Sequence, residues 1–398
     1  MHDQRDAVDP TAWFDSVDLA TLRARGGAKW SKYGPDVLAA WVADMDFPPV
    51  AAVRSALDAV LERGSLGYPW LLEHNPVADG FADWARRRHG WEIDPSLVVN
   101  TIDVLQPMLA LIELYSEPGD GIVVQDPIYP PFRNAIIDAG RVVVENRLGT
   151  SLDPSAMDLE GLAAGTDERT RVVLLCNPHN PTGRVFTRAE LQGLADLAIE
   201  RDWLVISDEI HADLIYPDQH HIPFATLGDE VAARTVTLTA ATKTFNIAGL
   251  RLAIAVFGSA AQLARYQSIP RYLLGGANIM GVEASVAAWR DGEAGLDALL
   301  PYLRANRDRV VEAVAAMPGV HMQAPQATYL AWLDCRELLE RSSAPNAFER
   351  FLQGGVALND GADFGTAGEG FVRLNFATSR GVLERILDRM NEVCLASF

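Results

Sequence analysis

Short, unbroken apolar runs recur along the first two thirds of the chain and predict the strands of a buried sheet. The runs are "LVVNT" (97–101), "GIVVQ" (121–125), "RVVVEN" (141–146), "RVVLLC" (171–176), "WLVIS" (203–207), "TVTLT" (235–239) and "LAIAVF" (252–257). Continuous runs of Val, Ile and Leu are typical of strands that are covered on both faces. We therefore expect a mostly parallel, seven-stranded sheet.

Helical patterns lie between these runs. They are "VLQPMLALIELYSE" (104–117), "RAELQGLADLAIER" (188–201) and "AQLARYQSI" (261–269). Alternation of strands and helices is the signature of an α/β fold, in which helices flank the sheet.

The pattern changes after residue 258 and predicts a second, smaller α+β unit. A helical region (about 280–317) is followed by a mixed segment (321–335), by "FVRLNFA" (371–377) and by a last helix (381–394). We expect an N-terminal segment (1–45) that packs on the small domain, a large domain (46–285) and a small domain (286–398).

Charge and cysteine content narrow the class of protein. The chain has 398 residues, with 34 basic and 53 acidic side chains and a net charge of −19. Such a charge disfavours nucleic acid and anionic membrane as partners. Three cysteines without a CxxC motif indicate buried thiols rather than disulfides or a zinc site. With no signal peptide and no apolar run of about 20 residues, we expect a cytoplasmic protein.

Histidines do not suggest a metal either. His220 and His221 are adjacent in a polar stretch, and neighbouring residues rarely chelate one ion without further ligands. We interpret them as solvated loop residues. Trp289 and Trp332 are interpreted as core residues.

Reactive side chains follow three of the predicted strands. Open α/β sheets bind ligands at the carboxyl ends of their strands. Asp208 follows "WLVIS", where it either caps the next turn or faces a heterocyclic nitrogen. Asn180, in "NPHNPTG", belongs to a turn-rich loop and offers an amide to a phenolic oxygen. Lys243 follows "TVTLT"; most lysines are solvated, but a desolvated lysine has a lowered pKa and is nucleophilic.

A second group of residues fits anions and a planar ring. Arg251 offers a fork of donors and Thr242 a hydroxyl to a phosphate, and the first amides of the helix near Val104 and Leu105 form an anion site. Tyr129 can stack on a ring. Arg373 is either a surface ion-pair residue or a bidentate clamp on a substrate carboxylate. Together with Lys243 these residues indicate pyridoxal 5'-phosphate.

The motifs resemble those of a known enzyme class. "SDEIHADLIY" (207–216), "NPHNPTG" (177–183), "ATKTFNIAGLR" (241–251) and "VRLNFATSR" (372–380) are similar to blocks of fold-type I, aspartate-aminotransferase-like pyridoxal-phosphate enzymes. "KW" (29–30), "WVADMDFPPV" (41–50), "GYPW" (67–70), "PIYPPF" (127–132) and "DFGTAGEGFVRLNFATSR" (363–380) resemble the cystathionine β-lyase and cysteine-S-conjugate β-lyase branch. The resemblance runs from about residue 25 to the end.

The resemblance implies roles around the cofactor ring. Lys243 would bind the cofactor covalently and later move the Cα proton. Asp208 would pair with the ring nitrogen, Asn180 would contact the ring oxygen, and Tyr129 would stack on the ring. His211 would take the place of a tyrosine that is common in aminotransferases.

The resemblance also implies residues that bind the phosphate and the substrate carboxylate, and it implies a homodimer. The phosphate would be held by Val104, Leu105, Thr242 and Arg251. Tyr68 would reach the phosphate of the neighbouring subunit, and Arg373 would bind the α-carboxylate of an amino-acid substrate.

Three positions depart from the family pattern. Asp103 stands where a small residue is expected beside the phosphate, and it would repel the phosphate unless it points away or caps the helix. Ala240 replaces a frequent phosphate-binding serine, and Gly295 replaces a tryptophan.

The leading hypothesis is a C–S β-lyase that cleaves an S-substituted cysteine to a thiol, pyruvate and ammonia. The alternative is transamination or a decarboxylation-linked deamination in a specialised pathway. A regulatory binding protein on the same fold is a third hypothesis, which the lysine disfavours.

Overall fold

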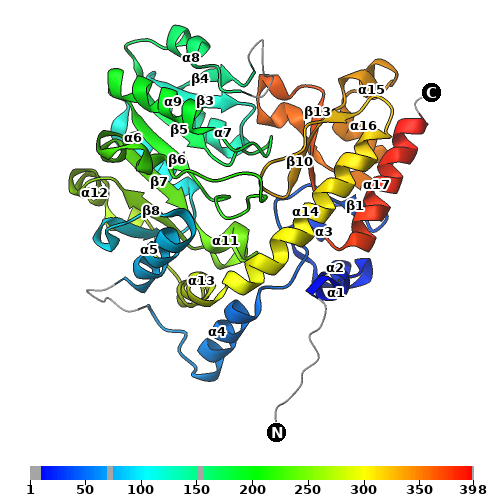
Figure 1. Cartoon of the computed structure of the whole chain (residues 1–398), viewed down its shortest axis with the longest axis horizontal. Helices are drawn as coiled ribbons and strands as arrows, with labels where there is room; N and C mark the ends of the chain where they lie inside the picture. Colours follow the sequence, from blue (N-terminus) through cyan, green and yellow to red (C-terminus); the bar gives the residue numbers. More distant parts are fainter. Residues whose placement is uncertain (1–9, 70–74, 150–155, 397–398) are drawn as a thin grey trace.

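The computed structural model describes residues 10–69, 75–149 and 156–396, with side chains from residue 13 onward. Residues 1–9 of the predicted N-terminal segment and Trp70 of the "GYPW" motif lie outside the described residues. A large α/β half and a smaller half, which contains the long helix α14, lie side by side (Figure 1).

Seven strands form the central sheet in the order β2-β8-β7-β6-β5-β3-β4. They are β2 (Val98–Thr101), β3 (Gly121–Asp126), β4 (Val142–Arg147), β5 (Thr170–Cys176), β6 (Leu204–Asp208), β7 (Thr235–Thr239) and β8 (Ala253–Phe257). β8 runs antiparallel to both of its neighbours, and the other pairs are parallel. The predicted α/β class with a mostly parallel seven-stranded sheet is confirmed.

Both faces of the sheet are buried, as the continuous apolar runs predicted. In β3, Ile122 and Val124 face one core and Val123 faces the opposite core. Helices that pack in the first of these cores are α6 (Leu105–Tyr115), α7 (Pro130–Asp138) and α12 (Ala260–Gln267); α8 (Leu159–Gly165) and α9 (Arg188–Glu200) pack in the second.

The other helices of the large half pack against one another or connect strands. They are α4 (Ala51–Glu62), α5 (Pro76–His89), α10 (Asp229–Ala233), α11 (Ala241–Thr244) and α13 (Ile279–Asp291). α13 packs on α4 and α5. Short 3-10 turns are Pro95–Leu97, Phe224–Leu227, Ala248–Leu250 and Arg271–Leu273.

The smaller half is α+β, as predicted. Its antiparallel sheet has the order β12-β13-β10-β9, formed by β9 (His321–Met322), β10 (Leu330–Asp334), β12 (Asn359–Asp360) and β13 (Phe371–Asn375). Its helices are α14 (Glu293–Ala315), α15 (Arg336–Glu340), α16 (Ala347–Gln353) and α17 (Arg380–Leu395), with 3-10 turns at Gly361–Phe364 and Thr366–Gly368.

The N-terminal segment contains α1 (Pro10–Asp15), α2 (Leu19–Arg25), α3 (Gly27–Ser31) and a strand that the sequence did not reveal. This strand, β1 (Leu38–Ala39), pairs in parallel with β11 (Val356–Ala357). Two residues are too short for a periodic signal, and their pairing partner is distant in sequence. The segment contacts α14 and β11, whereas the exact domain boundaries stay a prediction.

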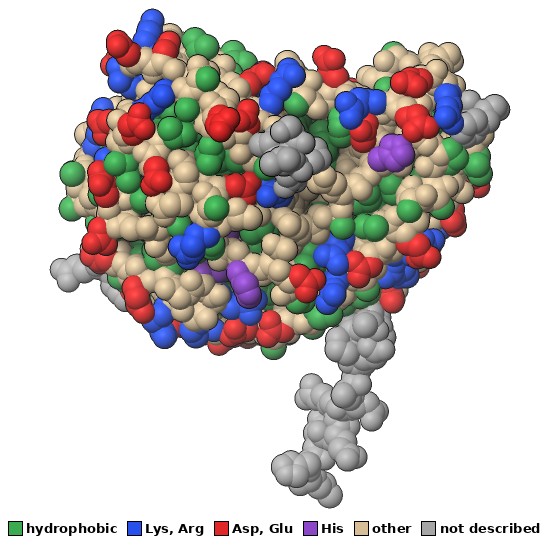
Figure 2. All heavy atoms as spheres, turned by 45° about the horizontal axis from the view of Figure 1, so that its top comes forward, with side chains coloured by type: hydrophobic (Ala, Val, Ile, Leu, Met, Phe, Trp, Pro, Cys, Tyr) green, Lys and Arg blue, Asp and Glu red, His purple; other side chains and the backbone are tan. Residues whose placement is uncertain are grey.

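The surface charges, the cysteines and the apolarity of the helices bear on the remaining predictions from composition. No helix within the described ranges has the length and apolarity that a bilayer crossing requires. Acidic and basic side chains are interspersed over the face shown in Figure 2. All three cysteines are buried and unpaired, as predicted. A cytoplasmic location stays a prediction.

Candidate active site

A pocket lies where the carboxyl ends of β5 and β6 meet the start of α6 and the helix α11. Two parallel neighbours end at the same edge of a sheet, which is why residues distant in sequence converge there. Nine residues singled out from the sequence line this pocket: Val104, Leu105, Tyr129, Asn180, Asp208, His211, Thr242, Lys243 and Arg251. Arg373 contacts the pocket through Asn180, and Tyr68 lies elsewhere.

Lys243 presents its amine to this pocket. Its Nζ donates a hydrogen bond of 2.8 Å to the carbonyl of Ala43. Burial is the largest influence on its pKa and lowers it, the Asp44 carboxylate opposes that shift, and the Arg373 guanidinium reinforces it. A lysine with a lowered pKa loses its proton more readily than a solvated lysine, and the free amine that results is a nucleophile and a base.

Asp208 is the last residue of β6 and is buried. Burial raises the pKa of its carboxyl to about 7, although a hydrogen bond from the amide of Ile210 (3.0 Å) counteracts the rise. A carboxylate in such surroundings gains most from a cationic partner that enters the pocket. A protonated ring nitrogen is a partner of that kind.

Arg373 is buried within β13, so the alternative of a surface ion pair is wrong. Its Nη1 donates to Asn180 Oδ1 (2.8 Å) and its Nη2 to Asn359 Oδ1 (2.7 Å). Both acceptors are neutral, its Nε has no partner within the described part of the chain, and burial lowers its pKa to about 10. A buried guanidinium of this kind is suited to a substrate carboxylate.

The end of the pocket expected to hold a phosphate contains Val104, Leu105, Thr242 and Arg251. The first amides of a helix have no intrahelical acceptor, and those of α6 open onto this end. Asp103 also lines it. Its Oδ1 accepts from the amide of Gln106 (2.8 Å), so it does cap the helix, and its Oδ2 lies 2.6 Å from Arg251 Nη2.

Two further residues form the walls. Burial, reinforced by Lys243 and Arg373, lowers the pKa of His211 to about 3, so its imidazole is neutral. Its Nδ1 is buried and has no partner in the described part of the chain. Burial raises the pKa of Tyr129, which packs edge-on against Phe132.

The sequence placed residues 41–47 in a family motif but did not reveal their contacts with the pocket, which Ala43 lines. Each of the seven backbone carbonyls in this segment accepts a hydrogen bond from a side chain. The carbonyls and their donors are Trp41 (Arg373), Val42 (Asn375), Ala43 (Lys243 and Tyr329), Asp44 (Lys29 and Asn375), Met45 and Phe47 (Asn246), and Asp46 (Arg25). These hydrogen bonds hold the segment in place, and the Ala43 carbonyl in turn orients the Lys243 amine.

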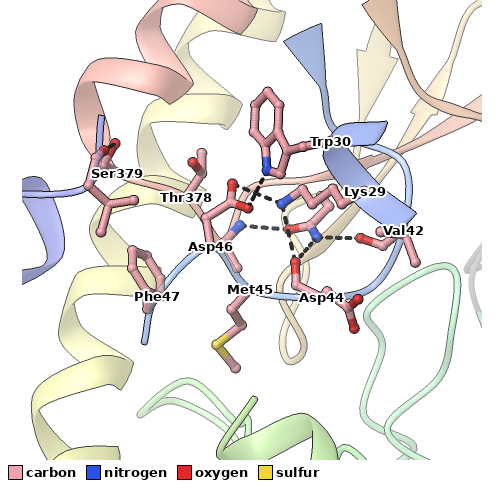
Figure 3. Close-up of polar contacts among 12 residues, drawn as sticks. Lys29, Trp30, Val42, Asp44, Met45, Asp46, Phe47, Thr378 and Ser379 are labelled. Atoms are coloured by element: carbon pink, nitrogen blue, oxygen red, sulfur yellow. Dashed lines mark hydrogen bonds and ion pairs between the residues drawn. The ribbon is translucent and has the colours of Figure 1, made fainter. Parts of the chain in front are cut away.

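Figure 3 shows how this segment is anchored to the N-terminal helices. Lys29 Nζ lies 3.0 Å from Asp46 Oδ2, and the indole Nε1 of Trp30 donates to Asp46 Oδ1 (2.8 Å). Both charged side chains of the pair are at least 95 % buried. The "KW" (29–30) and "WVADMDFPPV" (41–50) motifs therefore meet at one buried anchor, which only the tertiary structure reveals.

Breaking this anchor should destabilise the fold. Lys29→Met leaves the Asp46 carboxylate buried without its cation, and we expect the free energy of unfolding to fall by about 3 kcal/mol. The matched control is Lys32→Met, because Lys32 is exposed and should change stability by less than about 1 kcal/mol. Urea unfolding curves of both variants measure the difference, and equal curves would contradict the assigned role.

Other sequence interpretations have different outcomes. His221 is not a solvated loop residue: it is buried, and its Nε2 lies 2.7 Å from Glu209 Oε2. His220 is exposed, and the described residues contain no cluster suited to a metal ion. Trp289 is a core residue, as predicted, while Trp332 is partly buried and stacks on Phe371.

The remaining departures from the family pattern are explained in part. Ala240 is buried directly before α11 and brings no hydroxyl to the phosphate end. Gly295 lies in α14 against the residue that precedes α4, where a Cβ atom would be 2.6 Å from Cγ1 of Val50. A tryptophan at this position therefore requires Val50 to move.

Comparisons with known proteins give one consistent result. A family model described as "Aminotransferase class I and II" matches residues 42–390. "Cystathionine beta-lyase PatB" of Bacillus subtilis is 36 % identical over 91 % of this chain and 95 % of its own length. "Cystathionine beta-lyase" of Corynebacterium glutamicum is 34 % identical over 94 % of this chain and 99 % of its own length.

A solved structure of similar description superposes on nearly the whole chain. It is the PLP-bound C–S lyase from Staphylococcus hominis, with a TM-score of 0.88 and 26 % sequence identity. The match covers 96 % of this chain and 98 % of the other.

Proposed function

The chain belongs to the class I and II aminotransferase family, and from that premise we propose a pyridoxal-phosphate-dependent carbon–sulfur β-lyase that acts on an S-substituted cysteine. The observation that carries the proposal is the joint placement of Lys243, Asp208 and the buried Arg373 around one pocket. Relatives named as cystathionine β-lyases and C–S lyases favour elimination over the other reactions of this cofactor.

The residues fit pyridoxal phosphate. When bound, this cofactor supplies an aldehyde that reacts with amines and a ring that accepts electrons. The Lys243 amine would bind the aldehyde, and the Asp208 carboxylate would hold the ring nitrogen protonated. Asn180 would contact the ring oxygen, Tyr129 would cover one face of the ring, and the neutral His211 would lie at its edge. The phosphate would bind at Val104, Leu105, Thr242 and Arg251.

The chain's own groups account for substrate binding and proton transfer. Arg373 would bind the α-carboxylate and so fix the orientation of the Cα–H bond, since its guanidinium is held by Asn180 and Asn359. The Lys243 amine, set free when the substrate's amino group takes its place on the aldehyde, would then remove the Cα proton. Cleavage of the Cβ–S bond releases the thiol, and hydrolysis of the remaining three-carbon unit yields pyruvate and ammonia.

Product analysis tests this reaction. The purified protein, reconstituted with pyridoxal phosphate, is incubated separately with cystathionine and with S-methylcysteine. Equal amounts of thiol and pyruvate from either substrate support the β-lyase. A keto acid without thiol would indicate transamination, and release of carbon dioxide would indicate decarboxylation-linked deamination; either result overturns the proposal.

We also infer a homodimer. Tyr68 and Tyr272 are almost completely exposed, and Leu66 and Leu273 beside them are more than half exposed. Two segments that each expose large apolar side chains are candidates for burial in a subunit interface. A second copy of the chain would cover them and bring Tyr68 to the phosphate end of its neighbour's pocket.

Mixing two inactive variants tests the shared site. Tyr68→Ala and Lys243→Ala homodimers should each have low activity. If Tyr68 serves the neighbouring subunit, each mixed dimer has one intact site, and exchange of subunits should restore activity to about a quarter of the wild-type value. Thiol release before and after mixing measures this. No recovery, despite mixed dimers seen by native mass spectrometry, would assign Tyr68 to its own subunit's site.

A further inference from the structure

A carboxylate lies among the cationic groups of the pocket. Asp103 connects two elements there: its Oδ1 binds the first turn of α6 through the amide of Gln106, and its Oδ2 pairs with Arg251 at 2.6 Å. Its backbone carbonyl accepts a hydrogen bond of 2.9 Å from Thr101 Oγ1. Both the side chain and the backbone of Asp103 are therefore held by hydrogen bonds.

The arginine of this pair depends on Asp103 for its position. The Arg251 side chain is 60 % exposed, and its only ion pair within the described part of the chain is with Asp103. Its backbone has a left-handed conformation (φ 51°), which is uncommon for a residue with a side chain and directs the chain sharply from the preceding 3-10 turn into β8. The Arg251 guanidinium at the pocket is therefore already paired with the Asp103 carboxylate.

Asp103 leaves this end of the pocket with a net positive charge of only about one half. Arg251 contributes one positive charge, the start of α6 contributes roughly half a charge, and Asp103 removes one. A phosphate monoester carries about −1.5 to −2 charges at neutral pH. The same end without Asp103 would attract that anion more strongly, because the guanidinium and one more helix amide would be available to it.

We propose that Asp103 sets the affinity of the phosphate-binding end of the pocket, by occupying Arg251 and one amide of α6 that the cofactor's phosphate would otherwise use. The phosphate must share or displace this carboxylate. The chain therefore holds the phosphorylated cofactor less tightly than its other residues allow, and the cofactor exchanges more readily. This inference rests on the proposed function, because it presupposes that the phosphate binds at this end.

Asp103→Asn separates the charge from the cap. The asparagine side chain has the same shape, and its Oδ1 can still accept from the amide of Gln106, so the start of α6 is preserved. Cofactor-free protein is titrated with pyridoxal phosphate and, separately, with pyridoxal, which has the same aldehyde and ring but no phosphate. Absorbance of the bound chromophore gives both dissociation constants.

The expected result is specific to the phosphate. Asp103→Asn should bind pyridoxal phosphate about tenfold more tightly than the wild type, while the dissociation constant of pyridoxal stays the same. Inorganic phosphate should also compete with pyridoxal phosphate at lower concentrations in the variant. The matched control is Asp158→Asn, which removes the same charge from a carboxylate that caps α8 through the amide of Gly161 (2.9 Å), outside the pocket.

Each outcome decides the matter. Equal or weaker binding of pyridoxal phosphate by Asp103→Asn overturns the inference, and so does an equal gain for pyridoxal, because the effect would then not involve the phosphate. An equal gain in Asp158→Asn would assign the effect to net charge and would also overturn it. If neither the wild type nor Asp103→Asn forms a chromophore with pyridoxal phosphate, the proposed function itself falls.

Discussion

Replacing Lys243 with alanine is expected to lower kcat/KM for thiol release by at least about 10⁴-fold. The substitution removes the amine that would bind the cofactor covalently and the base that would take the Cα proton. Both losses act on the same reaction, so their effects do not add independently. The variant should also lose the absorbance band of the covalently bound cofactor, which gives a second readout besides turnover.

A matched control is available on the surface. Lys32→Ala removes an exposed lysine that interacts with the ring of Trp41, and it should retain activity within about threefold. We expect Lys243→Ala to fold, because its main lost contact is one hydrogen bond to the Ala43 carbonyl. Circular dichroism and urea unfolding test this. A folded Lys243→Ala protein with turnover within tenfold of wild type would exclude Lys243 as the catalytic base.

The sheet and most of the pocket were predictable for a simple physical reason. Strands buried on both faces require continuous apolar runs, which are visible in one sequence. Parallel strands then place the residues that follow them at one edge, so Asn180, Asp208 and Lys243 converge without any knowledge of tertiary contacts. The strands β1 and β11 were not predicted because each has only two residues, which is too short for an apolar run to be recognised.

The parts that sequence did not reveal depend on contacts between distant segments. The Ala43 carbonyl and Lys243 are 200 residues apart, and Tyr329 reaches the same carbonyl over 286 residues. A backbone acceptor has no residue-type signal, because any side chain can stand at its position. His221 was misinterpreted for a related reason, since its partner Glu209 lies on a different element and no local pattern connects the two.

Asp103 illustrates a case between these extremes. The sequence showed that an aspartate near a phosphate is unfavourable unless it caps the helix. The structure adds the pairing with Arg251, which converts a local departure into a statement about the charge of the whole phosphate end. Only the combination of the two leads to a measurable difference between pyridoxal phosphate and pyridoxal.

Asp208→Asn is expected to lower kcat by about 10³-fold while leaving the protein folded. The amide has nearly the shape of the carboxylate but cannot hold a ring nitrogen protonated, so the ring would accept electrons poorly. The buried position and the hydrogen bond from Ile210 are compatible with asparagine. Stopped-flow measurement of Cα–²H substrates would locate the loss in proton removal; an unchanged kcat would exclude the assigned pairing.

The same variant isolates a pH effect on the cofactor-free protein. The pKa of Asp208 is about 7 in the folded chain, against 3.8 for an unperturbed carboxyl. Between pH 4 and pH 7 the Asp208 carboxyl is protonated in the folded chain but ionised in the unfolded chain. The stabilisation that this proton provides is therefore fully present below pH 4 and is lost as the pH rises towards 7. The free energy of unfolding of the wild type relative to Asp208→Asn should therefore fall by up to about 3 kcal/mol between pH 5 and pH 8.

Urea curves at the two pH values measure this difference. Saturating pyridoxal phosphate should make the difference independent of pH, because a cationic ring nitrogen stabilises the carboxylate. A difference that stays constant between pH 5 and pH 8 would show that the Asp208 carboxyl is already ionised in the empty pocket at pH 5.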